Sequence, residues 1–255
     1  MRVDGYPSEW GEALGAYLSA MVDRLVNQSS TLSRWNQGGE KIEGTFARFA
    51  LPILWDFAEV NPLGDTSGGY PSAFEWVTLA TRHFAATAEK MPPPQSICDS
   101  AITMVPDDAD LMVTGPPYYD AIGYAVLMDF FYVWLRRSLF GLTPEIDRAF
   151  VQPMGPKWNH EKNDGELIDD ASRFGGDREK SRTAYEAGMF RAFQACHTAL
   201  MPNGCLVMVF AHKHPDAWEA LVSAMIRAGF VVDASWPIQT ERTARTRSLS
   251  SAALS

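Results

Sequence analysis

The sequence predicts an α/β protein in which a largely parallel sheet follows an N-terminal helical region. Apolar residues recur at helical spacing before residue 94, where a run of three prolines ends the pattern. From residue 95 onward, short apolar runs alternate with helical patterns, and this alternation implies parallel strands with covered faces. We therefore divide the chain into a helical region, residues 1–94, and a sheet-containing domain, residues 95–255.

Three helices are expected in the first region. The first begins after Pro7, with Ser8 as its N-cap, and carries one apolar stripe formed by Leu14, Leu18, Met21 and Leu25. The second covers residues 42–59, where the residues at helical spacing are Phe46, Phe49, Ile53 and Phe57. The third covers residues 73–89, after a glycine-rich loop.

Four strands are expected in the second region, at residues 96–98, 111–113, 205–210 and 230–236. Helical periodicity predicts three helices between them, over residues 125–140, 185–200 and 216–228. Residues 201–204 are expected to form a turn, and Gly229 to take the left-handed conformation that ends a helix. The polar, glycine-rich segment 141–180 is interpreted as a mobile insertion, a lid or a target-recognition element.

Charge and cysteine content limit the classes of partner. The formal net charge of -9 argues against a protein surface that binds nucleic acid over its whole length, because the affinity for duplex DNA comes largely from Lys and Arg side chains that neutralise phosphates. Local contacts remain possible at two basic clusters, although each can also be a solvated turn or helix end: Arg136 with Arg137, and Arg242 with Arg245 and Arg247.

Three cysteines, Cys98, Cys196 and Cys205, provide no disulfide framework and suit a reducing cytoplasm. No Cys-x-x-Cys pair is present, and no metal site is predicted. The apolar run over residues 121–135 contains Asp129 and is too short to cross a bilayer. We therefore expect a cytoplasmic protein.

Residues 113–120 form the most informative segment of the chain. Pro116 and Pro117 fix φ and remove two backbone donors, so the chain leaves the strand in a set direction. Tyr118 is thereby held at the carboxyl edge of a strand, where ligands bind in open α/β sheets. An aromatic ring on a stiff loop at that edge can stack on a nucleobase that has been swung out of its helix.

A strand that ends in Asp/Asn/Ser-Pro-Pro-aromatic resembles the catalytic motif of the amino-methylating, S-adenosyl-L-methionine-dependent DNA methyltransferases. The chain is most similar to one subgroup, the large adenine-specific DNA methylases that often carry a zinc ribbon. Pro-Pro-Tyr alone is a weak signal, but further matches cover most of the chain in the same order. They lie at residues 30–35, 55–62, 118–124, 129–137, 210–213 with 218–219, and 235–241.

The resemblance implies a partial Rossmann-like methyltransferase sheet, with S-adenosyl-L-methionine as cofactor and DNA as substrate. Methylation at adenine N6 is favoured over cytosine N4. The catalytic positions implied are Gly115, Pro116, Pro117 and Tyr118. Pro116 would offer its carbonyl to the base amine, Tyr118 would stack on the base, and Tyr119 and Asp120 would order the loop beside the substrate.

Two acidic or hydroxyl-bearing positions are implied near the cofactor. Asp99 resembles the family's strand-end acid, which accepts a hydrogen bond from the cofactor's adenine, although an Asp after a short strand can also simply form a turn. Thr114 is the second expected cofactor contact. The alternative for the Pro116–Tyr118 corner is a purely structural role, as an ordinary loop that follows a strand.

The chain departs from the family pattern in two places. Gly115 stands where the family has an acid or amide that accepts from the target amine; Thr114 and Asp120 are candidates to replace it. The family's glycine-rich cofactor loop has no counterpart, because no glycine pair here follows a strand and opens a helix. We therefore expect an interior or C-terminal piece of a longer enzyme. Either a second polypeptide supplies the missing cofactor-binding strands, or the chain is an inactive remnant; a non-catalytic nucleic-acid-binding module is the alternative.

Overall fold

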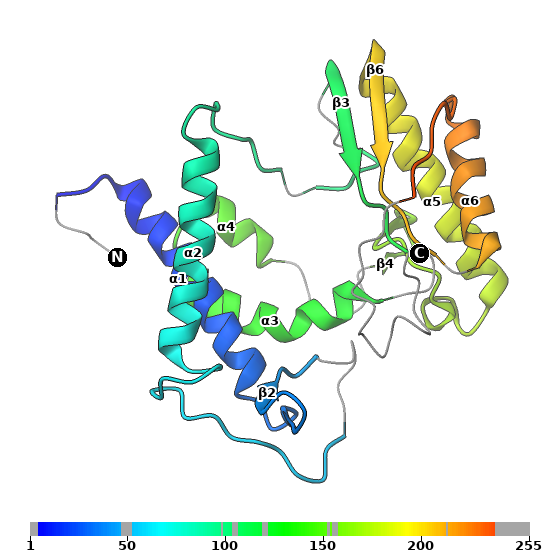
Figure 1. The fold of residues 1–255 in the computed structure, drawn as a ribbon. Helices are drawn as coiled ribbons and strands as arrows, with labels where there is room; N and C mark the ends of the chain where they lie inside the picture. The colour runs from blue at the N-terminus through cyan, green and yellow to red at the C-terminus, as the bar shows by residue number, and fades with distance from the viewer. Residues whose placement is uncertain are drawn as a thin grey trace. The chain divides into compact units, whose positions relative to one another are not determined.

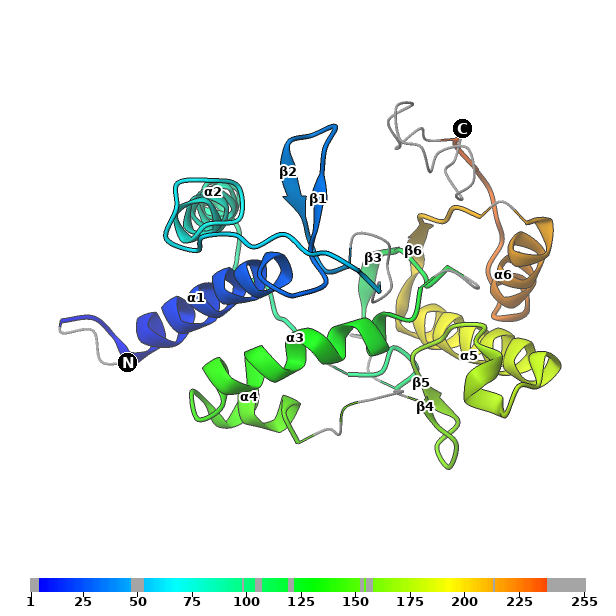
Figure 2. The same ribbon diagram turned by 90° about the horizontal axis from the view of Figure 1, so that it is seen from below.

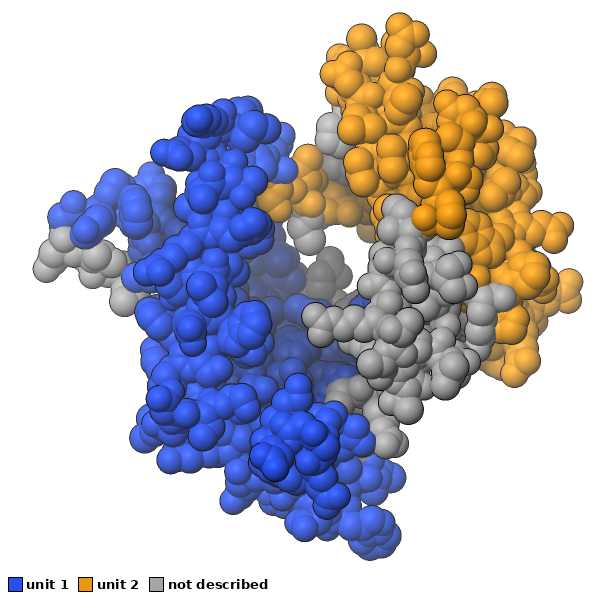
Figure 3. Space-filling model, viewed as in Figure 1, with its two compact units in different colours: residues 1–95, 124–155 blue, residues 96–123, 156–255 orange. Residues whose placement is uncertain are grey.

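A computed structural model describes residues 5–46, 53–97, 99–103, 107–118, 122–151, 154, 158–212 and 214–237. The chain divides into two compact units, shown in Figure 3, and each is described by itself. Unit 1 comprises Met1–Gln95 and Tyr124–Gly155, and unit 2 comprises Ser96–Gly123 and Pro156–Ser255. The division expected from the sequence differs in one respect, because residues 124–155 group with the helical region.

Unit 1 contains the helices α1 (Ser8–Gln28), α2 (Tyr70–Ala88), α3 (Tyr124–Leu139) and α4 (Pro144–Ala149). Helix α1 contacts both α2 and α3 (Figure 2). The ranges of α2 and α3 confirm two predicted helices to within three residues. Met21 on the apolar stripe of α1 is buried, whereas Leu14 on the same stripe remains exposed.

The N-cap of α1 is Pro7 and not Ser8. Ser8 is already the first helical residue, and its hydroxyl donates to the carboxylate of Glu9 instead of capping a backbone N–H. The cap prediction was therefore wrong by one residue, because a proline can precede the first turn without losing a needed donor.

A β-hairpin occupies the start of the segment that was expected to form the second helix. Strand β1 (Arg34–Asn36) pairs antiparallel with β2 (Lys41–Glu43), and the Glu43 carboxylate accepts from the side chains of both Arg34 and Asn36. Residues 53–63 contain no helix, and Ile53 is 94% exposed. The helix prediction for residues 42–59 was wrong there; Phe49 lies outside the described residues. Pro52, inside the run, removes a backbone donor that a helix needs.

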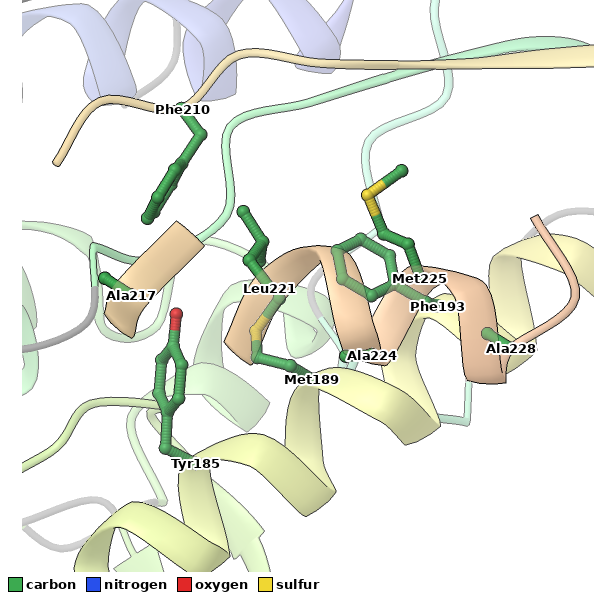
Figure 4. Close-up of a cluster of buried hydrophobic side chains, with 9 residues drawn as sticks. All are labelled: Tyr185, Met189, Phe193, Phe210, Ala217, Leu221, Ala224, Met225 and Ala228. Atoms are coloured by element: carbon green, nitrogen blue, oxygen red, sulfur yellow. The ribbon is translucent and has the colours of Figure 1, made fainter. Parts of the chain in front are cut away.

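Unit 2 contains a parallel strand pair, β3 (Ala109–Thr114) and β6 (Leu200–Met208), with the helices α5 (Arg178–Ala199) and α6 (Pro215–Arg227) (Figure 1). Helices α5 and α6 contact each other and supply most of the buried cluster in Figure 4. Leu206 and Met208 of β6 pack against that cluster. The cluster consists of Tyr185, Met189, Phe193, Phe210, Ala217, Leu221, Ala224, Met225 and Ala228.

Strand β6 begins earlier than predicted. The expected turn at residues 201–204 is an irregular part of the strand, where the pairing register shifts opposite Ala109 and Leu111. A Cβ on Gly204 would lie 2.9 Å from the carbonyl oxygen of Ala109, so only glycine lets the two backbones approach this closely.

Two predicted strands are missing from the described residues. Residues 230–237 form no strand, and neither do residues 96–97 and 99–103; Cys98 lies outside the described residues. An extended segment becomes a strand only when a neighbouring strand takes up its backbone hydrogen bonds. The preceding Gly229 does have a positive φ, 103°, as a residue that ends a helix often does.

The segment expected to be an insertion is divided between the units. Its first part contains α4, and its second part contains the hairpin β4 (Trp158–Asn159) and β5 (Asp164–Gly165) and the 3-10 helix η1 (Ala171–Phe174). In unit 2 the buried Arg173 pairs with Glu166 at 2.5 Å, and Ser181 of α5 donates to Asp169 at 2.5 Å. The first of these interactions lies within the segment, and the second ties the segment to α5.

The described residues thus form a mixed helix and strand structure with a small parallel sheet. Of the three two-stranded sheets among them, β3–β6 is parallel, and the hairpins β1–β2 and β4–β5 are antiparallel. No helix in the described part of the chain has the length and apolar character needed to cross a membrane.

Candidate functional site

The carboxyl ends of β3 and β6 lie at the same edge of the parallel pair. Thr114 is the register partner of Met208, and beyond it the N–H of Val209 donates to the carbonyl of Thr114 at 2.9 Å. After each strand the backbone leaves the sheet, through residues 115–118 after β3 and through residues 209–212 after β6. The two loops that follow parallel strands therefore start side by side, which is the arrangement that brings ligand-binding loops together in open α/β sheets.

The Pro-Pro corner is held in place from α5. Pro116 is buried, and the carbonyl oxygen of Pro117 accepts a hydrogen bond of 2.9 Å from the hydroxyl of Tyr185. Tyr185 is 1% exposed, so its hydroxyl needs a partner inside the protein. The corner is therefore rigid for two reasons: its own imino acids and a bond to a buried side chain.

The ring of Tyr118 lies on the surface of unit 2. It contacts the buried Phe210 at a centroid distance of 5.5 Å with the ring planes at 84°, an edge-to-face geometry. The side chain is still 38% exposed. A residue that stacks on an extruded base must be accessible, and Tyr118 is partly exposed.

Phe210 connects Tyr118 to a larger aromatic group. It meets Trp218 of α6 edge to face at 5.0 Å and lies nearly parallel to the ring of His212. The indole N–H of Trp218 donates to the carbonyl of His212, and Nδ1 of His212 accepts from the backbone N–H of His214. The loop after β6 is thereby ordered beside the loop after β3.

Gly115 leaves open space at this edge. A Cβ built on it meets nothing nearer than the carbonyl oxygen of Val209, 3.8 Å away, and its φ is not positive. Neither the backbone conformation nor the packing requires glycine here. A Cβ can therefore be introduced at this position without displacing a described neighbour.

Asp99 lines a cavity elsewhere in unit 2. The cavity has a volume of about 380 Å³ and includes Asp164 and Gly165 of β5, Leu167, and Ala192 of α5. One Asp99 carboxylate oxygen accepts from the N–H of Ser100 at 2.7 Å, the bond that an Asp makes at a turn. Tyr118 does not line this cavity.

Of the predicted site residues, the structure brings together Thr114, Gly115, Pro116, Pro117 and Tyr118 at one strand edge. Tyr119 and Asp120 lie outside the described residues. The sequence pattern predicts no site role for Tyr185, which bonds to the corner, for Phe210, which contacts the Tyr118 ring, or for Trp218, which packs against Phe210. The sequence does contain a signal for Tyr185: it is a tyrosine on a helix face that otherwise carries apolar residues. Because a buried phenol hydroxyl needs a hydrogen-bond partner, such a residue is expected to bond to a neighbouring segment.

Within the described residues, no group of three or more His, Cys, Asp or Glu side chains is placed to hold a metal ion. Burial raises the pKa of the Cys196 thiol, which keeps it in the less reactive protonated form.

No family model, no curated protein and no solved structure matches this chain.

Proposed function

We propose that this chain forms the target-base side of an S-adenosyl-L-methionine-dependent DNA methyltransferase, acting on adenine N6 in preference to cytosine N4. One observation carries the proposal: a rigid Pro-Pro-Tyr corner leaves the carboxyl end of a parallel strand and presents a partly exposed ring. On this view β3 and β6 are two strands of a Rossmann-like methyltransferase sheet.

The reaction joins the exocyclic nitrogen of the base to a methyl carbon. The carbon–sulfur bond breaks with its electron pair staying on sulfur, and the nitrogen releases a proton. The cofactor, when bound, supplies the activated methyl group, and the protein supplies positioning and electrostatics. Tyr118 would stack on the extruded base, and the Pro116 carbonyl would accept from its amine.

The residues present fit the cofactor in part. Asp99 would accept a hydrogen bond from the adenine amino group of the cofactor, and the cavity that it lines, about 380 Å³, lies within the volume range of small-molecule sites. Thr114, at the end of β3, is the second proposed contact. The chain lacks a glycine-rich turn after a strand, so the rest of the cofactor site would come from a second polypeptide.

The outer face of the parallel pair supports that second polypeptide. Leu111 and Val113 are 58% and 67% exposed, and Val207, the partner of Val113, is exposed on the same face. Exposed strand edges and apolar sheet faces favour association with other chains. Added strands would extend the sheet from the edge of β3, and the helices that connect parallel strands would cover these side chains.

Substitution at Gly115 tests the catalytic proposal. Gly115→Asp adds the missing acceptor at a position where the structure has room for a Cβ, and Gly115→Ala adds the Cβ without an acceptor. We expect radiolabelled methyl transfer from S-adenosyl-L-methionine to DNA to appear or increase with Asp and not with Ala. Both proteins should be assayed with and without the missing cofactor-binding region supplied as a separate polypeptide.

A non-catalytic nucleic-acid-binding module remains the second candidate, favoured by the same exposed Tyr118 ring. It predicts that Tyr118→Ala weakens DNA binding while the Gly115→Asp protein stays silent in the methylation assay under every condition. The cofactor site has its own test, since Asp99→Ala should lower S-adenosyl-L-methionine affinity by on the order of tenfold in calorimetry. Asp233→Ala, at an exposed position of unit 2 that does not line the cavity, is the control.

A further inference from the structure

A second cavity lies in unit 1, at the C-terminal end of α3. It has a volume of about 560 Å³, which is within the range of small-ligand sites. Its lining residues are Tyr132, Val133, Arg136, Arg137, Phe140 and Met154. The lining is aromatic and apolar apart from two guanidinium groups, and it contains no carboxylate.

Both guanidinium groups lack an acidic partner in the described part of the chain. Neither Arg136 nor Arg137 forms an ion pair there, although the chain has 31 acidic against 22 basic residues. Arg136 lies over the ring of Phe140 at 5.9 Å, and Arg137 lies over the ring of Trp134 at 5.8 Å. Such stacking orders a guanidinium and leaves its N–H groups free to donate.

The helix dipole explains only part of this arrangement. The helix dipole stabilises cations in the last turn of a helix, and this favours arginine at either position. It does not explain why two adjacent arginines line one cavity without a counter-charge. An anion from outside the chain would neutralise both.

The walls of the cavity narrow the class of anion. Two guanidinium forks match the oxygens of a phosphate, and exposed aromatic rings such as Phe140 offer a surface on which a base can stack. Sites for single-stranded nucleic acid combine these two features. The acidic net charge of the chain requires any such contact to be local, as this one is.

We propose that the cavity at the end of α3 binds a phosphate of a nucleic-acid strand through Arg136 and Arg137. The choice of a strand as ligand rests on the proposed function. The phosphate chemistry itself would be shared by a free nucleotide, so the experiment includes both.

The test is fluorescence anisotropy with a short single-stranded DNA oligonucleotide between about 50 and 200 mM salt. The double variant Arg136→Gln/Arg137→Gln should bind on the order of tenfold more weakly, and the slope of log affinity against log salt should fall by about 0.7, for the one lost phosphate contact. Arg24→Gln/Arg82→Gln is the matched control. It also removes two exposed arginines from unit 1, one of them stacked over Trp76, but neither lines the cavity.

A second variant separates the cavity from simple surface charge. Val133→Phe keeps both arginines and fills part of the space, and it should also weaken binding if the ligand enters the cavity. Thermal unfolding of each variant shows whether the fold is kept. Equal affinity of the double variant and its control would overturn the proposal, as would unchanged binding by a folded Val133→Phe protein.

Competition identifies the source of the phosphate. If adenosine monophosphate displaces the oligonucleotide only at a large molar excess, the ligand is a strand; if it binds the wild type tightly and the double variant weakly, the site takes a free nucleotide. The methylation assay keeps the two proposals apart. DNA binding that depends on the two arginines, without methyl transfer, would contradict the methyltransferase proposal and support the phosphate site. Methyl transfer together with unchanged DNA binding by the double variant would support the methyltransferase proposal and contradict the phosphate site.

Discussion

The hydroxyl of Tyr185 on α5 donates a hydrogen bond to the carbonyl oxygen of Pro117, 2.9 Å away. The two residues are 68 positions apart in the sequence, and one of them is buried in the core of unit 2. Through this bond the packing of α5 and α6 sets the position of the corner that carries Tyr118. The stability of the core and the geometry of the candidate site are therefore coupled.

Tyr185→Phe should loosen the corner at a modest cost in stability. Loss of the bond leaves the Pro117 carbonyl without this donor, and we expect the free energy of unfolding to fall by about 1 kcal/mol. Hydrogen exchange at the amides of Gly115 and Tyr118 should become faster. Tyr132→Phe is the control, since it loses a comparable bond to the carbonyl of Phe150 in unit 1 and should leave exchange at the corner unchanged.

Leu221→Ala should be among the most destabilising substitutions in unit 2. The side chain is 0% exposed, in the buried cluster formed by α5, α6 and Phe210. Truncation of a fully buried leucine costs about 2–5 kcal/mol. Chemical denaturation measures this, and a loss below about 1 kcal/mol would contradict the packing described. Val231→Ala, at an exposed position, should change the value by less than about 0.5 kcal/mol.

Gly204→Ala and Gly115→Ala should have opposite outcomes. The new methyl group at residue 204 would lie 2.9 Å from the Ala109 carbonyl oxygen, so the strand pair must shift, at a cost of about 1–3 kcal/mol. At residue 115 the nearest atom is 3.8 Å away, and the stability should stay the same or rise by up to about 1 kcal/mol. Equal stability of the two variants in urea would show that β3 and β6 are not paired as described.

Asp23→Asn should stabilise the protein in a pH-dependent way. Burial raises the pKa of Asp23 to about 6, and one of its carboxylate oxygens is buried without a hydrogen bond among the described residues. Below the unfolded value of 3.8 the carboxyl is protonated in both states, and it contributes nothing. Between pH 4 and 6 the unfolded chain ionises first, so the folded protein loses stability as the pH rises.

The variant removes that penalty. Its melting temperature should match the wild type near pH 4 and exceed it above pH 6, by the equivalent of about 1 kcal/mol after allowance for solvent screening. Asp65→Asn, at an exposed loop position, should show no such pH dependence. A gain that is the same at both pH values would rule out ionisation of Asp23 as its cause.

Helices were predicted best because their hydrogen bonds are local. The apolar periodicity of α3 and α5 and the glycine after α6 lie within or next to the segments that they organise. Helices α3 and α6 form within one residue of their predicted ranges, while α5 begins at Arg178, seven residues before the predicted start at residue 185. Strand β3 and the Pro-Pro corner could also be located from the sequence, since proline restricts its own backbone whatever surrounds it.

Strand formation depends on pairing with another strand, and the sequence pattern does not show which segments will pair. Residues 230–236 have the composition of a strand but no neighbour to pair with among the described residues, whereas residues 34–43 pair with each other and form a hairpin where a helix was expected to begin. Side-chain contacts over long separations are equally hidden. The sequence by itself determined a rigid corner that ends in an aromatic ring. Only the tertiary structure decided that α5 holds this corner through Tyr185, that Phe210 supports the ring and that part of the ring faces solvent, because each depends on residues that meet only when the chain has folded.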